Sequence, residues 1–241
     1  MTTAGAAQPV RDIDARIAWI VCGLLFAAIV ALVFLSPDLL SGPGRTTEQG
    51  LLEQGQNLIL AIALVLAVTT LLAADTRYLR VWLALIILGL VYLLGEEISW
   101  GQHYFNWETG GFFADINDQG ETNFHNTAGG WLDQKPRAIL LFGMLMGVVV
   151  HPLVRWARKG RGLFDHPWWL APTLASLPPF VFSQLGALPK RLDSLHVLNW
   201  LPYVRWSEVE EVFMYLFFVT YLLSLRTRLM QRKRLGLAPA A

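Results

Sequence analysis

Residues 81–126 read VWLALIILGLVYLLGEEISWGQHYFNWETGGFFADINDQGETNFHN. An apolar run opens this stretch and ends at two adjacent carboxylates, Glu96 and Glu97. A run of this length predicts a helix that crosses a hydrocarbon core ~30 Å thick, which requires roughly 20 residues. The residues that follow are rich in carboxylates, amides and histidines. The stretch therefore indicates a membrane protein whose polar chemistry lies where this helix ends.

The rest of the chain has the same character. Of its 241 residues 54% are hydrophobic, and the mean hydropathy is +0.44. We predict one all-α domain over residues 1–241, a polytopic membrane bundle of about six transmembrane helices. A polar outer loop is expected at 101–137, and the predicted spans lie at 17–35, 57–74, 81–100, 138–154, 168–188 and 207–225.

Charge and cysteine content exclude several classes of protein. The formal net charge of +1 gives no sign of a nucleic-acid partner. Cys22 is the only cysteine, which excludes an intrachain disulfide and a thiolate metal cluster. The sequence also lacks HExxH, GxSxG and a phosphate-binding glycine loop. No common catalytic motif therefore identifies the function.

The basic residues predict how the bundle sits in the membrane. With the N-terminus inside, 13 of the 19 lysines and arginines fall in inner segments, whereas 14 of the 18 acids fall outside. Because cytoplasmic loops retain basic residues, both termini are expected in the cytoplasm. The expected location is the inner membrane of a bacterium, crossed several times, with the polar loop on the periplasmic side.

Two helices are expected to carry acids to a similar depth. Counting 1.5 Å per residue from Arg80 puts Glu96 roughly 24 Å up a 30 Å core. Counting back from Arg226 brings Glu208 and Glu211 to the same outer boundary. An acid at this depth is costly, so each is by default a candidate functional residue.

Helical spacing suggests how the polar residues meet. If the third helix continues past its carboxylates, Glu96 and His103 share one face. The alternative is that both glutamates are interfacial residues paired with Lys135 or Arg137. For the last helix, Ser207 and Glu210 have the spacing of a capping box, which would give the acids there a structural role.

A carboxylate and an imidazole four residues apart, Glu121 and His125, can share a metal ion on one helical face. Such ligands suit a divalent ion, Zn²⁺, Mn²⁺, Fe²⁺ or Mg²⁺. A metal-free site would use Glu96 or Glu97 as the base and His125 as the acid, and these three are the candidate catalytic residues. The candidate metal ligands come from three predicted segments and are Glu96, His103, Glu121, His125, Glu208 and Glu211.

The polar stretch also resembles a family of uncharacterised bacterial polytopic membrane proteins, which carry EEISWGQ and a downstream Q-x-E-x-N-x-H-N pattern. About thirty residues are covered. The resemblance implies a bacterial membrane location and brings no activity with it. The matching residues are Glu96, Glu97, Ser99, Trp100, Gln102, Gln119, Glu121, Asn123, His125 and Asn126.

The leading hypothesis is a membrane-embedded enzyme, metal-dependent or metal-free, that acts on a lipid or lipid-linked substrate at the outer leaflet. It predicts that the acids and His125 converge in one cavity. One alternative is a cation- or proton-coupled transporter, although its ionisable groups would be expected nearer the midplane. Another is a non-catalytic membrane subunit of a larger complex, which predicts an exposed and adaptable outer surface instead of a buried polar cluster.

Overall fold

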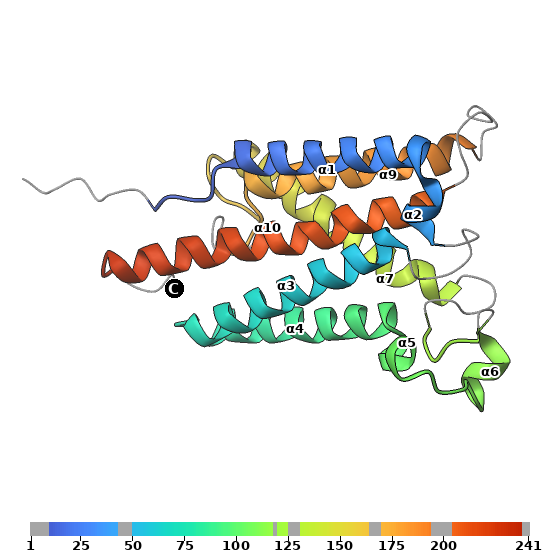
Figure 1. Ribbon diagram of the computed structural model, residues 1–241. Coiled ribbons are helices and arrows are strands. Elements are labelled where there is room, and N and C mark those ends of the chain that lie inside the picture. Colours follow the sequence, from blue (N-terminus) through green and yellow to red (C-terminus); the bar gives the residue numbers. More distant parts are fainter. Residues whose placement is uncertain are drawn as a thin grey trace, which may run out of the picture.

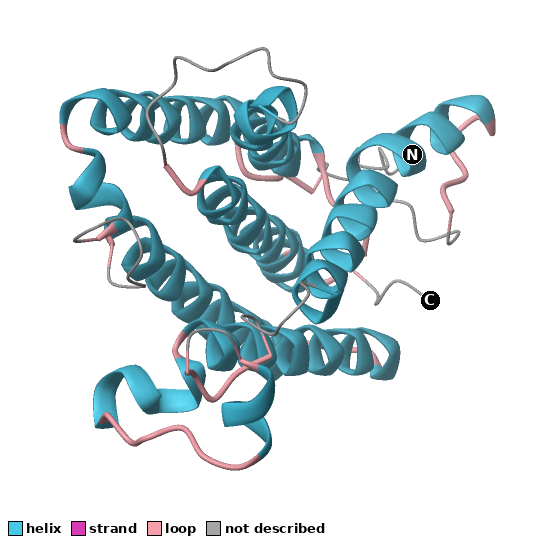
Figure 2. Ribbon diagram, turned by 90° about the vertical axis from the view of Figure 1, so that its right-hand side faces the viewer, coloured by secondary structure: helices cyan, strands magenta, loops and turns pink. Residues whose placement is uncertain are grey.

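The computed structural model describes residues 10–42, 50–117, 120–124, 131–163, 170–193 and 204–237, with the backbone alone for 131–135. Within these ranges the regular secondary structure is helical, as the sequence predicts (Figure 2). The long helices are α1 (Ala15–Leu35), α3 (Leu51–Ala73), α4 (Arg77–Glu97), α7 (Trp131–Leu145), α9 (Leu177–Asp193) and α10 (Trp206–Arg234). The short ones are α2 (Pro37–Ser41), α5 (Gln102–Phe105), α6 (Phe112–Ile116) and α8 (His151–Ala157).

Among the described residues, five helical segments are long and apolar enough to cross a membrane. Four are α1, α3, α4 and α10. The fifth, Pro136–Ala157, joins α7 to α8 through the π-turn Met146–Val150, which immediately precedes His151-Pro152. A proline cannot donate to the helix ladder, so a local widening there is expected.

The span predicted at 168–188 is not among these five. Helix α9 begins at Leu177, after the 3₁₀ turn Leu174–Ser176, and has 17 residues. Pro178 and Pro179 lie in its first turn. The missing N–H of a proline costs nothing at that position, because first-turn N–H groups have no partner within the helix.

Helix α10 runs through the middle of the bundle. Figure 1 shows it between α1 and α9 on one side and α3 and α4 on the other. Its side chains Phe213, Leu222, Leu225 and Leu229 are fully buried. A helix that is buried all round organises the packing of its neighbours, and here it separates two apolar clusters, one with α1 and one with α3 and α4.

The outer faces of the surrounding helices are apolar. Large hydrophobic side chains on α1, α3, α4 and α7 are exposed, among them Leu24, Leu72, Leu88 and Ile139. Soluble monomers rarely expose continuous apolar faces of this extent. These faces are suited to contact with lipid, in agreement with the predicted membrane fold.

The two ends of the bundle differ. Helices α5 and α6 lie at one end, together with the end of α4 and the starts of α3 and α10, and we call this the polar end (Figure 1). Helix α1 begins and α10 finishes at the opposite end. The carboxylates of α4 and α10 that the sequence singled out are thus gathered at the polar end.

The helices begin and end a few residues away from the predicted membrane spans. Helix α3 begins at Leu51 rather than 57, and α4 ends at Glu97 rather than 100. Helix α7 begins at Trp131, inside the expected loop 101–137. The first residues of α3 and α7 are polar and show no apolar periodicity. The sequence pattern therefore does not predict that these helices begin so early.

Close packing of α9 on α10 depends on Gly186. A Cβ at this position would lie 3.2 Å from the backbone of Val209 and Glu210. We expect Gly186→Val to lower the free energy of unfolding by about 1–3 kcal/mol through overpacking. Thermal unfolding in detergent, followed by tryptophan fluorescence, measures the effect.

The matched control is Gly89→Val on α4, where an added Cβ meets nothing within 4 Å. Both changes introduce the same β-branched side chain into a helix. Equal losses of stability in the two variants would contradict the close approach of α9 and α10.

Candidate functional site

The end of α4 is a sharp turn that the sequence did not indicate. Ser99, Trp100 and Gly101 have φ values of 47°, 53° and 107°, all in the left-handed region. The indole of Trp100 folds back over Gly95, where an added Cβ would lie 2.9 Å from the ring, and its Nε1 donates to Glu96 Oε1 at 2.8 Å. The prediction of one continuous helical face from Glu96 to His103 is therefore wrong.

The turn is held by a polar group that we call the turn cluster: Ser99, His103, Asn117, Glu121 and Asn123. Glu121 is at its centre. Its Oε1 lies 2.9 Å from His103 Nε2, and its Oε2 accepts from Ser99 Oγ at 3.0 Å and from Asn123 Nδ2 at 2.7 Å. Its backbone N–H donates to Asn117 Oδ1 at 3.0 Å. The cluster ties the returning loop to the strained end of α4.

Serine, histidine and glutamate in contact suggest a catalytic triad, but the geometry does not fit one. In a triad the serine and the carboxylate contact different nitrogens of the imidazole. Here Ser99 Oγ, at 3.0 Å, and Glu121 Oε1 both approach Nε2 of His103. Ser99 is also fully buried and accepts from Asn123 Nδ2 at 2.8 Å. These contacts do not form a catalytic triad, and they hold the turn in place.

The electrostatics of the turn cluster favour ionised Glu121. Burial on its own raises the pKa of this carboxyl. The hydrogen bond and positive charge of His103 outweigh burial, together with hydrogen bonds from Asn123 and Ser99, and they lower the pKa of Glu121 from 4.5 to about 2. The carboxylate is thus charged at any physiological pH and acts as a fixed acceptor.

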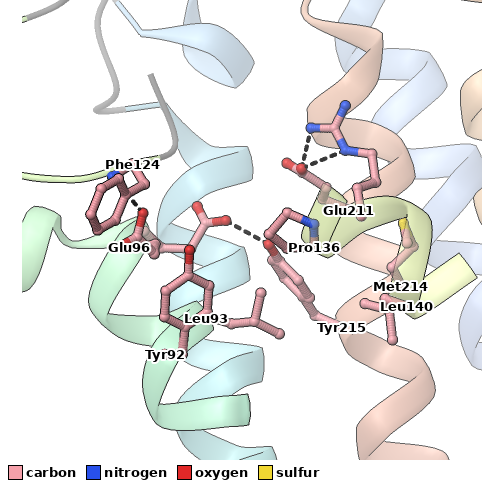
Figure 3. A pocket seen from close by; sticks show the side chains of 11 residues that line it. Tyr92, Leu93, Glu96, Phe124, Pro136, Leu140, Glu211, Met214 and Tyr215 are labelled. Carbon is pink, nitrogen blue, oxygen red and sulfur yellow. Dashed lines mark hydrogen bonds and ion pairs between the residues drawn. The ribbon is translucent and has the colours of Figure 1, made fainter. Parts of the chain in front are cut away.

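A cavity adjoins the turn cluster at the polar end, enclosed by α4, α7 and α10 (Figure 3). We call it the central cavity. Its volume is about 30 Å³. Acidic, basic and apolar side chains line it together: Tyr92, Leu93, Glu96, Glu97, Phe124, Pro136, Arg137, Leu140, Glu211, Met214 and Tyr215.

Two polar contacts cross the central cavity between helices. Tyr215 Oη donates to Glu97 Oε1 at 2.6 Å and joins α10 to α4. Arg137 donates through Nε, at 2.9 Å, and through Nη2 to Glu211 Oε1, and joins α7 to α10. Glu96 accepts from the backbone N–H of Phe124 at 2.7 Å. Arg137, which the alternative interpretation paired with the α4 carboxylates, donates to Glu211 of α10.

Glu208 lies elsewhere at the polar end, in contact with α3. Arg205 donates to Glu53 Oε1 at 2.8 Å and lies 3.2 Å from Glu208 Oε1. Gln56, which is fully buried, donates through Nε2 to Glu208 Oε2 at 3.0 Å. These four side chains form a clamp between α3 and α10.

The expected capping box of the last helix is absent. Helix α10 begins at Trp206 with Arg205 as its N-cap, and no side chain caps it. Glu210 instead lies 3.5 Å from Arg191 of α9. Acids in the first turns of α10 are therefore used for contacts between helices rather than for capping.

The structure distributes the predicted site residues over three places. Glu96, Glu97 and Glu211 line the central cavity, Glu121 and His103 belong to the turn cluster, and Glu208 belongs to the clamp. His125 lies outside the described residues. Within the described ranges, no three His, Cys, Asp or Glu side chains are grouped so that they could hold a metal ion.

The partners of these acids are only weakly marked in the sequence. Tyr215 follows Glu211 by four residues, so one face of α10 carries both into the central cavity. That spacing was the only available signal. The roles of Trp100 and Arg205 depend on a left-handed turn and on a helix start that no periodicity reveals.

Comparison of the chain with protein-family models, with curated proteins and with solved structures finds no match. The function is therefore argued from the geometry of the polar end.

The depressed pKa of Glu121 predicts how the loop responds to acid. An ionised carboxylate with a folded pKa of about 2 and an ordinary pKa of 4.5 stabilises the loop fully above pH 4.5. That contribution is lost as the pH falls from 4.5 towards 2. Hydrogen exchange of residues 98–124, corrected for intrinsic rates, should show protection that declines over this range.

In Glu121→Gln the same amides should be less protected at neutral pH and should show no such decline. Glu108→Gln is the matched control, because Glu108 is exposed in the same loop. Protection in Glu121→Gln that follows the wild-type pH profile would show that this carboxylate does not hold the loop.

Proposed function

We propose that the protein is an enzyme embedded in the membrane, with an active site at the outer leaflet that acts on a lipid or lipid-linked substrate. The central cavity carries the proposal. Glu97 and Glu211 meet Arg137 and Tyr215 there, inside a bundle whose outer faces are apolar. Ionisable groups at such depth are rare, and they mark functional sites more often than surface charges do.

The central cavity suits an activated water molecule. Its volume of about 30 Å³ exceeds the roughly 10–15 Å³ that one water needs, and polar groups on three helices offer hydrogen bonds. The carboxylate of Glu97 is placed to accept a proton from such a water. The guanidinium of Arg137 can stabilise negative charge that develops on an attacked oxygen. This chemistry favours hydrolysis or transfer at an acyl or phosphoryl group.

Lipid is the substrate class that fits the surroundings. Leu93, Leu140 and Met214 supply an apolar part of the cavity lining. The segment Pro136–Ala157, which forms one wall, is the least buried of the five membrane-length segments. A substrate can therefore approach sideways from the bilayer along α7 with its chains still in hydrocarbon.

A metal-dependent form of the proposal places a divalent ion, Zn²⁺, Mn²⁺, Fe²⁺ or Mg²⁺, at the polar end. Its support is the choice of donors, since carboxylates suit hard ions and the imidazole of His125 or His103 suits borderline ones. Such an ion would polarise the attacked oxygen or activate the water. Elemental analysis of the purified protein distinguishes the two forms.

We further propose six passes through the inner membrane of a bacterium, with the polar end facing the periplasm. Helix α9 lies beside α1 and α10 and continues the turn Leu174–Ser176, which brings it near the length that a ~30 Å core requires. The basic residues support the direction. Arg155 lies in the last turn of the membrane-length segment that ends at Ala157, and Arg158 and Lys159 follow that segment, at the end opposite α5 and α6.

The enzymatic proposal predicts a large effect of Glu97→Gln. The amide can still accept from Tyr215 Oη but cannot take a proton. Turnover of lipids by protein in nanodiscs of bacterial polar lipid, followed by mass spectrometry, should fall by about 10²–10⁴-fold. Glu108→Gln removes the same charge from the exposed loop and should retain wild-type turnover.

No lipid conversion by the wild type, in nanodiscs and in cells alike, would reject the enzyme. Cation or proton flux lost in Glu97→Gln would then support the transporter. Copurification of a partner complex that survives Glu97→Gln would support the non-catalytic subunit.

The topology is tested by cysteines introduced singly into a Cys22→Ala background. A membrane-impermeant maleimide should label Gly110→Cys and Asp193→Cys in intact cells. It should label Arg161→Cys and Arg234→Cys only after permeabilisation. Labelling of Asp193→Cys and Arg161→Cys from the same side would show that α9 does not cross, and labelling of Gly110→Cys only from inside would reverse the orientation.

A further inference from the structure

A second pocket lies at the polar end, between α7, α9 and α10, and we infer that it binds the phosphate group of an anionic lipid headgroup. We call it the basic pocket. Its volume is about 390 Å³, and its lining consists of Arg137, Ala138, Leu141, Ala187, Lys190, Arg191 and Glu210. That this lipid is also the substrate rests on the proposed function. Binding of the lipid to the basic pocket can be measured whether or not the protein is an enzyme.

Charge is the first argument. Three basic side chains line the basic pocket, and one carboxylate, Glu210, faces them. Arg191 lies 3.5 Å from Glu210, and Arg137 pairs with Glu211. For Lys190 the structure gives no hydrogen-bond or ion-pair partner among the described residues. Even with both carboxylates counted, the pocket retains an excess of positive charge that attracts an anion.

The kind of cation is the second argument. Guanidinium groups bind phosphate through two parallel hydrogen bonds, and an ammonium group adds a compact point charge. Arg137, Arg191 and Lys190 supply both types on two facing helices. Basic pockets between transmembrane helices are a recognised way to hold lipid headgroups.

Shape is the third argument. A volume of about 390 Å³ exceeds a bare phosphate and lies in the range of small-molecule sites. Ala138 and Ala187 are small, which leaves the space between α7 and α9 open, and Leu141 makes the wall apolar. Exposed Ile139 and Phe142 on α7 offer acyl chains a path towards the membrane.

The two pockets meet at Arg137. This side chain lines both the basic pocket and the central cavity, and its partner Glu211 lines the central cavity. A phosphate held in the basic pocket is therefore adjacent to the water and carboxylates of the proposed active site. The site accordingly favours a phosphate-bearing lipid over a neutral one as substrate.

The test is lipid binding by the whole, delipidated protein in a neutral detergent. Native mass spectrometry counts bound phosphatidylglycerol and, in parallel, zwitterionic phosphatidylcholine. We expect a preference for phosphatidylglycerol. In the double variant Lys190→Gln/Arg191→Gln this binding should weaken by about tenfold or more, because each basic side chain near an anionic lipid contributes roughly fivefold.

The matched control is Arg158→Gln/Lys159→Gln, an adjacent, exposed basic pair at the opposite end of the bundle. It removes the same charge and should leave the preference intact. Equal binding of the two lipids by the wild type, or equal losses in the two double variants, would overturn the inference.

Two further experiments are needed. Competition with inorganic phosphate distinguishes a lipid headgroup from free phosphate, and a comparison of binding with turnover distinguishes the lipid-binding site from the proposed enzyme. Displacement of phosphatidylglycerol by millimolar inorganic phosphate shows that the pocket recognises the phosphate alone, and resistance to it shows that glycerol and acyl chains contribute. Phosphatidylglycerol bound through Lys190 and Arg191 without any turnover rejects the enzyme and retains this site. Turnover restricted to neutral lipids retains the enzyme and rejects phosphate-bearing lipid as its substrate.

Discussion

The architecture depends on the polar contacts that α10 makes at its buried start. Glu208 reaches α3, Glu210 reaches α9, Glu211 reaches α7, and Tyr215 reaches α4. Glu208, Glu211 and Tyr215 lie on one face of α10, at spacings of three and four residues, and Glu210 lies on another face. The four side chains nevertheless contact four different helices. A charge buried without a partner costs several kcal/mol, which means that each contact fixes the position of one surrounding helix. About two turns of α10 thus set the geometry of the polar end.

The same contacts explain why pockets form there. Helix α7 meets α10 where Arg137 donates through Nε and Nη2 to one oxygen of Glu211, and the segment that contains α7 is the least buried of the five membrane-length segments. Space remains on both sides of Arg137, the central cavity towards α4 and the basic pocket towards α9. The Arg137–Glu211 pair is a contact between long side chains of α7 and α10, and space remains beside it. At Gly186, by contrast, α9 packs directly against the backbone of α10 and leaves no space.

The turn cluster stabilises the end of α4, which lies beside the central cavity. The left-handed residues Ser99 and Trp100 store backbone strain, and hydrogen bonds centred on Glu121 offset it. As a result α4 ends with both carboxylates directed into the bundle, and the returning chain brings the backbone of Phe124 to Glu96. The loop therefore contributes Phe124 to the lining of the central cavity.

The sequence by itself determined the all-α membrane fold and the gathering of acids at one end, because apolar length and composition are local properties that hydrocarbon selects directly. It also marked Glu97 and Glu211, since acids within apolar runs are conspicuous. Only the tertiary structure decided that Arg137 pairs with Glu211, that Glu121 holds a turn, and that Glu208 clamps α3. Such partnerships join residues far apart in the chain, and they depend on helix rotation and on a left-handed turn. Helical periodicity specifies neither, because it describes each helix without its neighbours.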